Sequence, residues 1–415
     1  MKSEPEILTF GCRLNAYESE VMRKHATDAG LDNAIIVNSC AVTKEAERSV
    51  RQAIRRARKD NPEAQIIVTG CASQIDPDSY AAMPEIDRII GNDLKLEAKT
   101  WGLETDDRII VNDIMTVEET ASHLVDGFEG RARAFLQVQN GCDHRCTFCI
   151  IPYGRGNSRS VPVGMISDNV KHLVEQGFNE VVMTGVDVTS YGPDLPGKPQ
   201  LGQMIRRVMA LVPDLKRLRL SSLDPVEIDD DMWWLIENEP RFMPHLHLSL
   251  QAGDDMVLKR MKRRHLRQDV IDVCQKARAL RPDIVFGADI IAGFPTETDE
   301  MFENTHRIVE ECDLTFLHVF PYSERDGTPA AKMPQVDHPI RKQRAKLLRE
   351  AGEQQIEKFN QAQIGKKTSV IIEQNGHGRT EHFAEVELDK HMDAGTFHEI
   401  EITSYEDGLL KGRLV

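Results

Sequence analysis

Apolar runs alternate with helix-like segments from the start of the chain. Three of these runs, residues 7–10, 34–37 and 66–69, are each followed within three residues by a cysteine. Segments with helical periodicity lie between them, among them residues 44–59, so the pattern predicts β-α-β units and a parallel sheet. The carboxyl ends of parallel strands gather at one sheet edge. We therefore expect Cys12, Cys40 and Cys71 at one edge, although they are far apart in sequence.

A second set of apolar runs follows a less regular stretch near residues 95–130. The six runs are residues 135–138, 181–184, 218–221, 246–250, 285–291 and 316–320. Six βα units in succession predict a partial (β/α)6 barrel with its site at the carboxyl ends of the strands. A strongly charged helix near residues 340–362 leads out of this barrel.

The pattern changes to short strands and turns beyond residue 366. Strands are predicted at residues 368–372, 382–388, 398–402 and 409–414, and glycines punctuate them. This arrangement is typical of a small antiparallel β-barrel. The predicted class is thus α/β with three domains: a parallel-sheet α/β domain over residues 1–115, a partial barrel over 130–362, and a β-barrel over 366–415.

Composition places the chain among globular proteins. Its 415 residues are 40% hydrophobic and 29% charged, and no apolar run approaches the roughly 18–20 residues that cross a bilayer. The N-terminal residues show no signal peptide, so we expect a cytoplasmic protein with no membrane partner. The net charge of −15 argues against a general nucleic-acid coat but permits a local basic groove.

Cysteine spacing carries the candidate chemistry. Eight cysteines in a chain of this kind do not indicate a disulfide framework. Cys142, Cys146 and Cys149 share one short loop after the first barrel strand, and thiolates select zinc, copper(I) or iron–sulfur clusters. A closed zinc site needs a fourth ligand, for which His144 is the nearest candidate. An iron–sulfur cluster on three thiolates instead keeps one iron open. Cys274 and Cys312 lie on helical patterns and are predicted to be structural.

This loop and barrel resemble the radical S-adenosylmethionine (SAM) superfamily. The resemblance implies that Cys142, Cys146 and Cys149 hold a [4Fe–4S] cluster whose open iron chelates SAM. One electron from the cluster then cleaves SAM to a radical that abstracts hydrogen from an unactivated C–H bond, while the protein binds, orients and excludes water.

The whole chain resembles the methylthiotransferase family. The matching motifs are Thr9-Phe10-Gly11-Cys12-Arg13-Leu14-Asn15, Val37-Asn38-Ser39-Cys40, Val68-Thr69-Gly70-Cys71, Gly141 through Gly156, Leu248 through Asp254 and Gly293 through Thr298. The resemblance implies a TRAM-type C-terminal barrel and a second [4Fe–4S] cluster on Cys12, Cys40 and Cys71, where sulfur is held and methylated. One SAM supplies the methyl group and another the radical.

Polar residues of the barrel are the expected SAM contacts. Gln251 ends the fourth barrel strand, and Asp289 and Gly293 lie on or just after the fifth. Arg263 belongs to a basic run and is a candidate partner for the SAM carboxylate. Strand or helix capping and a solvated basic face are the alternative roles of these residues.

The substrate expectation also comes from resemblance. Residues 318–333 and 11–18 look most like the branch that acts on N6-threonylcarbamoyladenosine beside the tRNA anticodon. The expected partners are the anticodon stem-loop of tRNA and an electron donor such as a flavodoxin or ferredoxin. The alternatives are isopentenyladenosine in tRNA, an aspartate of a ribosomal protein, and, outside enzymes, a zinc-stabilised RNA-binding module.

Features typical of RNA binding are confined to short segments and do not extend over the whole chain. The predicted helix at residues 44–59 carries Arg48, Arg51 and Arg55 on one face. The C-terminal segment has more acidic than basic residues, which is unusual for an RNA-binding module. Phe383, Phe397 and Tyr405 are available there either for base stacking or for a core.

Overall fold

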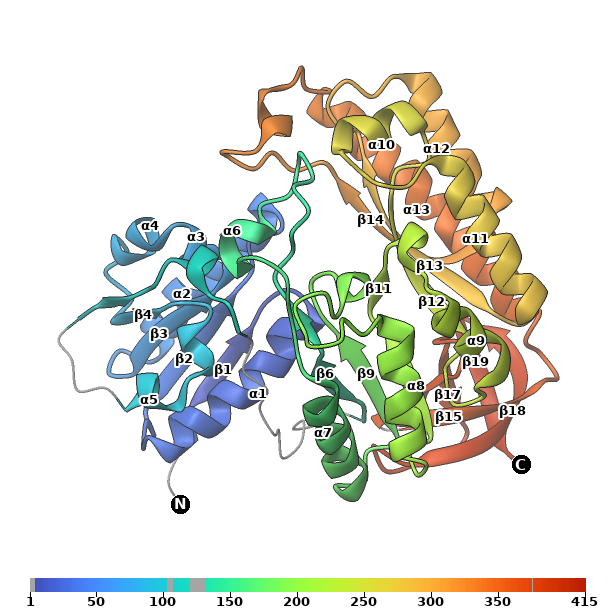
Figure 1. The fold of residues 1–415 in the computed structure, drawn as a ribbon, viewed down its shortest axis with the longest axis horizontal. Helices are drawn as coiled ribbons and strands as arrows, with labels where there is room; N and C mark the ends of the chain where they lie inside the picture. Colours follow the sequence, from blue (N-terminus) through green and yellow to red (C-terminus); the bar gives the residue numbers. More distant parts are fainter. Residues whose placement is uncertain (1–3, 103–106, 120–131, 375) are drawn as a thin grey trace.

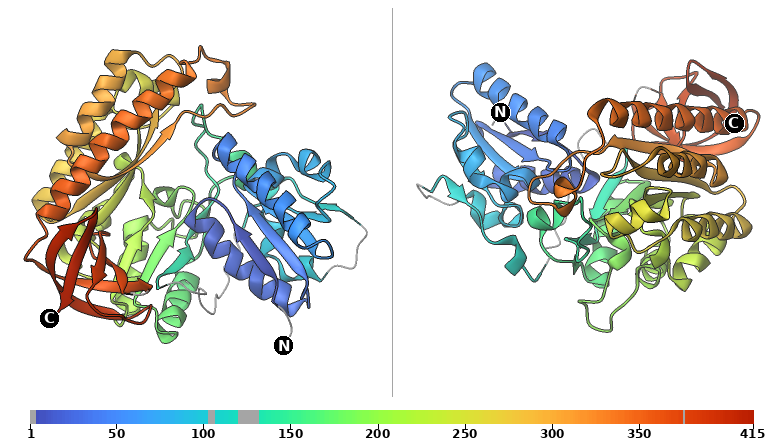
Figure 2. Two further views of the ribbon diagram at one scale, coloured as in Figure 1. Left: turned by 180° about the vertical axis from the view of Figure 1, so that it is seen from behind. Right: turned by 90° about the horizontal axis from the view of Figure 1, so that it is seen from above.

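The computed structural model describes residues 4–102, 107–119, 132–374 and 376–415. Figures 1 and 2 show an N-terminal α/β unit beside a central curved sheet covered by helices, with a small barrel against one end of that sheet. The three predicted fold types are confirmed. The predicted domain boundaries stay a prediction, and residues 103–106 and 120–131 of the less regular stretch lie outside the described residues.

The N-terminal sheet is parallel throughout, with its strands in sequence order. Its strands are β1 (Glu6–Thr9), β2 (Ala34–Ser39), β3 (Gln65–Gly70), β4 (Arg88–Ile90) and β5 (Ile109–Ile110). Its helices are α1 (Arg13–Asp28), α2 (Lys44–Asp60), α3 (Cys71–Ile75), α4 (Pro77–Ala81) and α5 (Ala98–Trp101). The three predicted strands form its first half, and β4 and β5 are too short to give a periodic signal.

Helix α1 joins this sheet to the central barrel. Its residues Leu14, Tyr17 and Val21 are buried in the same apolar core as the barrel strands. The N-terminal unit is therefore held against the barrel by shared apolar burial, which excludes water from the contact.

The central sheet contains the six predicted strands, all parallel. They are β6 (Ala134–Gln137), β9 (Glu180–Thr184), β10 (Arg217–Leu220) continued by β11 (Ser222–Leu223), β12 (His245–Gln251), β13 (Val285–Ala292) and β14 (Leu314–Pro321). Their helices are α7 (Val163–Glu175), α8 (Leu201–Leu211), α9 (Asp230–Asn238), α10 (Asp255–Met261), α11 (Arg267–Leu280) and α12 (Asp299–Glu311). Among the described strands β6 and β14 are not paired with each other, so the barrel is partial.

Shorter elements complete this region. A two-stranded antiparallel pair joins β7 (Gln139–Asn140) to β8 (Arg159–Ser160), and α6 (Ile151–Arg155) lies between them in sequence. The 3-10 helices are η1 (Leu94–Leu96), η2 (Ile114–Thr116), η3 (Val188–Ser190), η4 (Pro225–Glu227) and η5 (Pro329–Lys332). The predicted charged helix is α13 (His338–Gln361), which lies along the last strands of the sheet (Figure 1).

The C-terminal segment closes into a five-stranded barrel. Its strands are β15 (Lys367–Gln374), β16 (His377–Thr380), β17 (Glu385–Leu388), β18 (Phe397–Glu406) and β19 (Leu409–Leu414). The antiparallel expectation holds for all neighbours except β17 and β19, which pair in parallel. The reason is topological, because an odd number of strands in a closed ring cannot alternate direction at every contact.

The small barrel docks at the amino ends of the central strands, opposite their carboxyl edge. Phe383 stacks on His245 at the start of β12, with ring centroids 5.2 Å apart. The guanidinium of Arg219 lies 5.0 Å from the same phenyl ring. Phe397 faces Arg217 at 5.1 Å, and Tyr405 packs against the barrel's own core. The three aromatic residues considered for base stacking thus all have partners within the protein.

Candidate active site

The carboxyl ends of two parallel sheets bring the cysteine triplets into one region. Cys12 caps α1 after β1, Cys40 follows β2, and Cys71 begins α3 after β3. Cys40 and Cys71 are buried, whereas Cys12 is exposed. The predicted clustering of these three thiols is supported by their electrostatics, because Cys71 and Cys12 both act on the pKa of Cys40.

Tight turns shape this first triplet. Gly11 and Gly70 adopt φ angles of +94° and +97°, which side chains other than hydrogen rarely tolerate. A Cβ on Gly11 would lie 2.8 Å from the sulfur of Cys40. Burial and, to a smaller extent, the neighbouring thiols of Cys71 and Cys12 raise the pKa of Cys40 to about 12. A thiolate at Cys40 therefore requires a compensating positive centre.

Buried cations lie next to the triplet of Cys12, Cys40 and Cys71. Glu18, Lys95 and Arg155 form a network with side chains at most 2% exposed. Arg155 donates to both carboxylate oxygens of Glu18, at 2.8 and 2.9 Å, and Lys95 donates at 2.7 Å. Burial alone would raise the pKa of Glu18, but the two cations outweigh it and hold the pKa below its usual value. One carboxylate against two cations leaves an excess of positive charge beside three thiols, which suits an anionic, thiolate-held centre.

The second triplet occupies the loop between β7 and α6. The sulfur of Cys142 lies 3.6 Å from Oδ2 of Asp187, and that of Cys146 lies 3.7 Å from Nη1 of Arg263. Burial raises the pKa of Cys149 to about 11. Backbone hydrogen bonds from Ile151 and His144 and the nearby cation Arg263 oppose this effect, and a bound metal would stabilise the thiolates further.

Helix α6 connects the two triplets. A Cβ on Gly154 would lie 3.1 Å from the carbonyl oxygen of Cys71, so the helix backbone approaches the first triplet closely. Asn92 donates to the Gly154 carbonyl at 2.6 Å, and its amide nitrogen lies 3.7 Å from the sulfur of Cys71. Arg155 on the same helix reaches Glu18. The loop that carries Cys142, Cys146 and Cys149 therefore ends in a helix that contacts the N-terminal triplet at Cys71.

The spacing of the cysteine sulfurs within each triplet helps to distinguish a zinc ion from an iron–sulfur cluster. Among the described residues, the metal-ligand groups whose donor atoms all lie within 4.8 Å of one another are His247–Asp289–His318 and His144–Asp187–Glu227, and neither contains a cysteine. Three thiolates on one tetrahedral zinc ion, each at about 2.3 Å, would lie about 3.8 Å apart. In each triplet at least one pair of sulfurs is therefore more than 4.8 Å apart, which favours a multi-iron cluster, whose irons each take one thiolate, over a single zinc ion. His144 pairs with Asp187 at 3.1 Å and is not positioned as a fourth ligand.

Two family models match the chain. Residues 136–309 match the radical SAM superfamily, and residues 5–91 match the uncharacterized protein family UPF0004. The threonylcarbamoyladenosine tRNA methylthiotransferase MtaB of Rickettsia prowazekii is 59% identical over 410 residues, which cover 99% of this chain and 97% of that protein. The chain belongs to the radical SAM methylthiotransferase family.

Other relatives in this family are more distant. MtaB of Thermotoga maritima is 35% identical over 98% of this chain and 96% of its own length. The tRNA-2-methylthio-N(6)-dimethylallyladenosine synthase of Maricaulis maris is 32% identical over 98% of this chain and 96% of its own length. Among solved structures, the radical SAM methyltransferase TsrM from Kitasatospora setae aligns with a TM-score of 0.58, at 15% identity, over 80% of this chain and 75% of that one. This last likeness confirms the fold.

Membership in this family establishes the type of reaction and the cofactors of the protein. The methylthiotransferase is a transferase that uses [4Fe–4S] chemistry and SAM, as the radical SAM family does. None of the helices within the described residues has the length and apolar character that a membrane span requires.

The expected SAM contacts occupy different settings in this methylthiotransferase. Arg263 bonds Asp224 at 2.8 Å and the Ser249 carbonyl at 2.9 Å, beside Cys146. Gln251 ends β12 with φ +66°, and Gly293 follows β13 with φ +73°. A Cβ on Gly293 would lie 2.6 Å from Cγ of Arg341, so packing of α13 already requires glycine there. The SAM roles of these residues stay a prediction.

Asp289 lies instead in a cavity of about 480 Å³ between the N-terminal unit and the barrel. Cys12 and Cys40 line one side of this cavity, and Asp289 and His318 line the barrel side. The size is within the range of small-molecule sites. The cavity therefore places two cysteines of the N-terminal triplet within reach of a ligand in the barrel mouth.

Sequence reasoning missed the polar residues that support the site. Glu18, Lys95 and Arg155 are up to 137 residues apart, so no spacing signals their network. Arg13, His247 and His318 of the cavity were also missed. One part of the cavity could have been found from sequence. His245 and His247 are two residues apart on one strand, so their side chains lie on the same face of the sheet.

Proposed function

We propose that the chain methylthiolates C2 of N6-threonylcarbamoyladenosine beside the tRNA anticodon, with two [4Fe–4S] clusters and with SAM as both methyl donor and radical source. The observation that carries the reaction is the pair of three-thiol sites brought together by two parallel sheets. The 59% identity to an MtaB protein over nearly the full chain supports the substrate. The relative named for dimethylallyladenosine is 32% identical, which makes that nucleoside the second candidate.

We assign Cys142, Cys146 and Cys149 to the radical-generating cluster and Cys12, Cys40 and Cys71 to the cluster that carries sulfur. When bound, these clusters supply the electron that cleaves SAM and the site at which sulfur is held. The protein supplies the rest. Arg155 and Lys95 balance charge behind the N-terminal triplet, and Arg263 lies against Cys146.

The chain's parts have separate tasks in this proposal. Residues 1–115 hold the sulfur-carrying cluster, residues 130–362 bind SAM, with Gln251, Arg263, Asp289 and Gly293 as candidate contacts, and residues 366–415 form a TRAM-like barrel. A flavodoxin or ferredoxin is the proposed electron donor.

The proposed RNA contact involves helix α2, whose first turn borders the cavity. Arg48, Arg55 and Arg56 expose 69%, 60% and 85% of their side chains, and their ion pairs with Glu45, Glu85 and Asp60 lie at the surface, where phosphates can compete for the guanidinium groups. Arg51 is different, because its guanidinium lies 4.3 Å from the Tyr80 ring and bonds Ser79. The RNA face therefore differs from the face predicted by spacing alone.

The test is a comparison of tRNA nucleosides, by mass spectrometry, from cells with and without the gene. Selective loss of 2-methylthio-N6-threonylcarbamoyladenosine, with accumulation of its unthiolated precursor, is the expected result. An unchanged level of that nucleoside would reject the substrate and direct attention to isopentenyladenosine and to the ribosomal-protein aspartate.

A further inference from the structure

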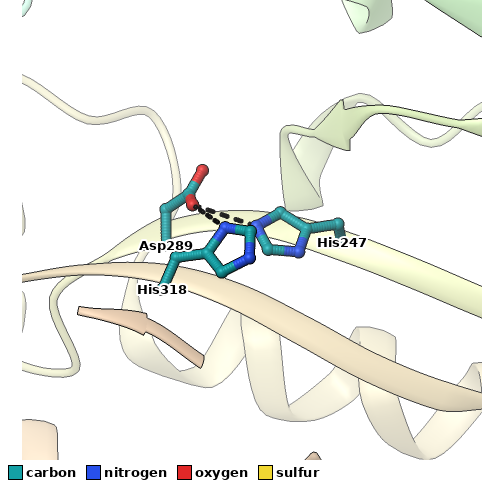
Figure 3. A group of neighbouring side chains, drawn as sticks. All are labelled: His247, Asp289 and His318. Atoms are coloured by element: carbon teal, nitrogen blue, oxygen red, sulfur yellow. Dashed lines mark hydrogen bonds and ion pairs between the residues drawn. The ribbon is translucent and has the colours of Figure 1, made fainter. Parts of the chain in front are cut away.

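Three adjacent strands direct polar side chains into the cavity that also contains Cys12 and Cys40. Asp289 on β13 lies directly opposite His318 on β14, and His247 on β12 pairs with Gly287, two residues before Asp289. Gly287 makes room for the histidine, because a Cβ there would lie 2.4 Å from Nδ1 of His247. The three side chains therefore meet on one face of the sheet (Figure 3).

Both imidazoles meet a single carboxylate oxygen. Nε2 of His247 lies 3.0 Å, and Nδ1 of His318 3.2 Å, from Oδ1 of Asp289. Since the carboxylate accepts from both rings, each ring nitrogen at these contacts carries the proton. Figure 3 shows the second oxygen of Asp289 pointing away from both rings. The remaining nitrogen of His318, Nε2, is then available to a ligand, and this side chain is 55% exposed.

A cation also lines the cavity. Arg13 follows Cys12, its guanidinium lies 5.7 Å from the centroid of the Phe383 ring, and both Glu180 and Asp289 are near enough to interact with its charge. A guanidinium is suited to a carboxylate because its donors match the two oxygens.

We propose that Arg13 and the His247–Asp289–His318 group form a subsite for a polar, carboxylate-bearing substituent on the target base. Arg13 pairs with the carboxylate, and Nε2 of His318 hydrogen-bonds to a hydroxyl or amide of the same substituent. The inference rests on the proposed function and extends it to substrate choice. A threonylcarbamoyl group presents a carboxylate, a hydroxyl and amide hydrogens together.

The same residues exclude the second candidate substrate. A dimethylallyl group has no polar atoms, so it would cover Nε2 of His318 and the guanidinium of Arg13 without offering either of them a hydrogen bond. Each buried polar group left unpaired costs about 1–3 kcal/mol, and a site built to hydrogen-bond a substrate group rejects an analogue that lacks it. Selectivity between the two nucleosides would then be set in this cavity and not by the rest of the tRNA.

The experiment uses the full-length chain loaded with iron. Its binding is measured to three anticodon stem-loop RNAs that differ from one another at one base. The base is adenosine, N6-threonylcarbamoyladenosine, or the methyl ester of the latter, in which a methyl group replaces the negative charge of the carboxylate. Dissociation constants are measured for the wild type, Arg13→Gln, His318→Leu and, as a matched histidine control outside the cavity, His391→Leu. Iron content is measured for each protein, because Arg13 is adjacent to Cys12.

The wild type and His391→Leu should bind the acid about tenfold to a hundredfold more tightly than the ester, the range of a charge-assisted hydrogen bond. Arg13→Gln, with unchanged iron, should bind acid and ester alike. His318→Leu should keep the acid-to-ester ratio but lose about tenfold in its preference for the threonylcarbamoyl base over adenosine.

Acid-to-ester discrimination that survives in Arg13→Gln would overturn the subsite. A wild type that methylthiolates the threonylcarbamoyl RNA but binds acid and ester equally would also overturn it, while leaving the proposed function intact. A wild type that discriminates acid from ester yet leaves every base unmodified would support the subsite and reject the proposed reaction.

Discussion

Glu180 is the anion at the contact between the central sheet and the C-terminal barrel. Its side chain is 1% exposed, with Oε1 3.0 Å from Nε of Arg219 and 3.8 Å from Nη1 of Arg133, and with Oε2 3.6 Å from Nη1 of Arg217. The same arginines reach the barrel, since Arg217 bonds Ser369 and Arg219 bonds the Glu381 carbonyl. Burial alone would raise the pKa of Glu180, but the guanidinium groups lower it to about 2.

The change Glu180→Gln keeps the shape and removes the charge. Arg217 and Arg219 then stay buried without their anion, and breaking a buried pair costs about 3–5 kcal/mol. Linkage gives an independent value: a pKa lowered from 4.5 to about 2, at about 1.4 kcal/mol per unit, contributes about 3 kcal/mol. We expect a loss of about 3 kcal/mol in the free energy of unfolding at pH 7.

Acid should reduce this difference, to roughly half of its neutral-pH value at about pH 3, because that pH still lies above the folded-state pKa of about 2. Because the folded-state pKa is depressed, the contribution of Glu180 is present above the unfolded value of 4.5 and is lost as pH falls toward about 2. Guanidinium denaturation of the iron-free wild type and variant at about pH 7 and about pH 3 measures both effects. Glu401→Gln, which breaks the exposed pair with Arg413, is the control and should change stability by less than about 1 kcal/mol. A loss below about 0.5 kcal/mol at pH 7, or an equal loss at both pH values, would refute the reasoning.

Three further predictions concern the cluster sites. Cys146→Ala should abolish SAM cleavage, whereas Cys71→Ala should spare cleavage and stop sulfur insertion; equal loss of both reactions in Cys71→Ala, with the other cluster intact, would contradict the assignment. Arg155→Met should lower the iron content from about eight to about four per chain, because it removes a buried cation behind the N-terminal triplet. Gly141→Ala should impair folding of the Cys142 loop by more than about 1 kcal/mol, since its Cβ would lie 1.8 Å from the Asn157 carbonyl at a φ of +73°; wild-type stability in this variant would reject the argument.

Strong hydrophobic periodicity explains which elements were predictable. The runs at residues 34–37 and 66–69 became β2 and β3, and the amphipathic segment at 44–59 became α2, within two residues at each end. Strand β16 (His377–Thr380) was missed because its sequence, His-Gly-Arg-Thr, has no alternating apolar positions. The parallel pairing of β17 with β19 was missed because strand direction follows from closure of the whole barrel.

The same limit applies to the site. The cysteine sites could be predicted from the sequence because each cysteine follows an apolar strand, and the ends of parallel strands gather at one edge of a sheet. The cavity was not, because its walls come from β12, β13, β14 and the β1–α1 turn, which only folding brings together. Asp289 was expected near SAM from its position on a strand, but its hydrogen bonds to His247 and His318 depend on register and on the missing side chain of Gly287.

The central claim is that each cysteine triplet holds its own [4Fe–4S] cluster. It is tested most directly by anaerobic iron and sulfide analysis of the reconstituted wild type and of the variant with Cys12, Cys40 and Cys71 all replaced by Ala. We expect about eight irons per chain for the wild type and about four for the variant. Saturation of the wild type at about four irons, with no further loss in the variant, would contradict it.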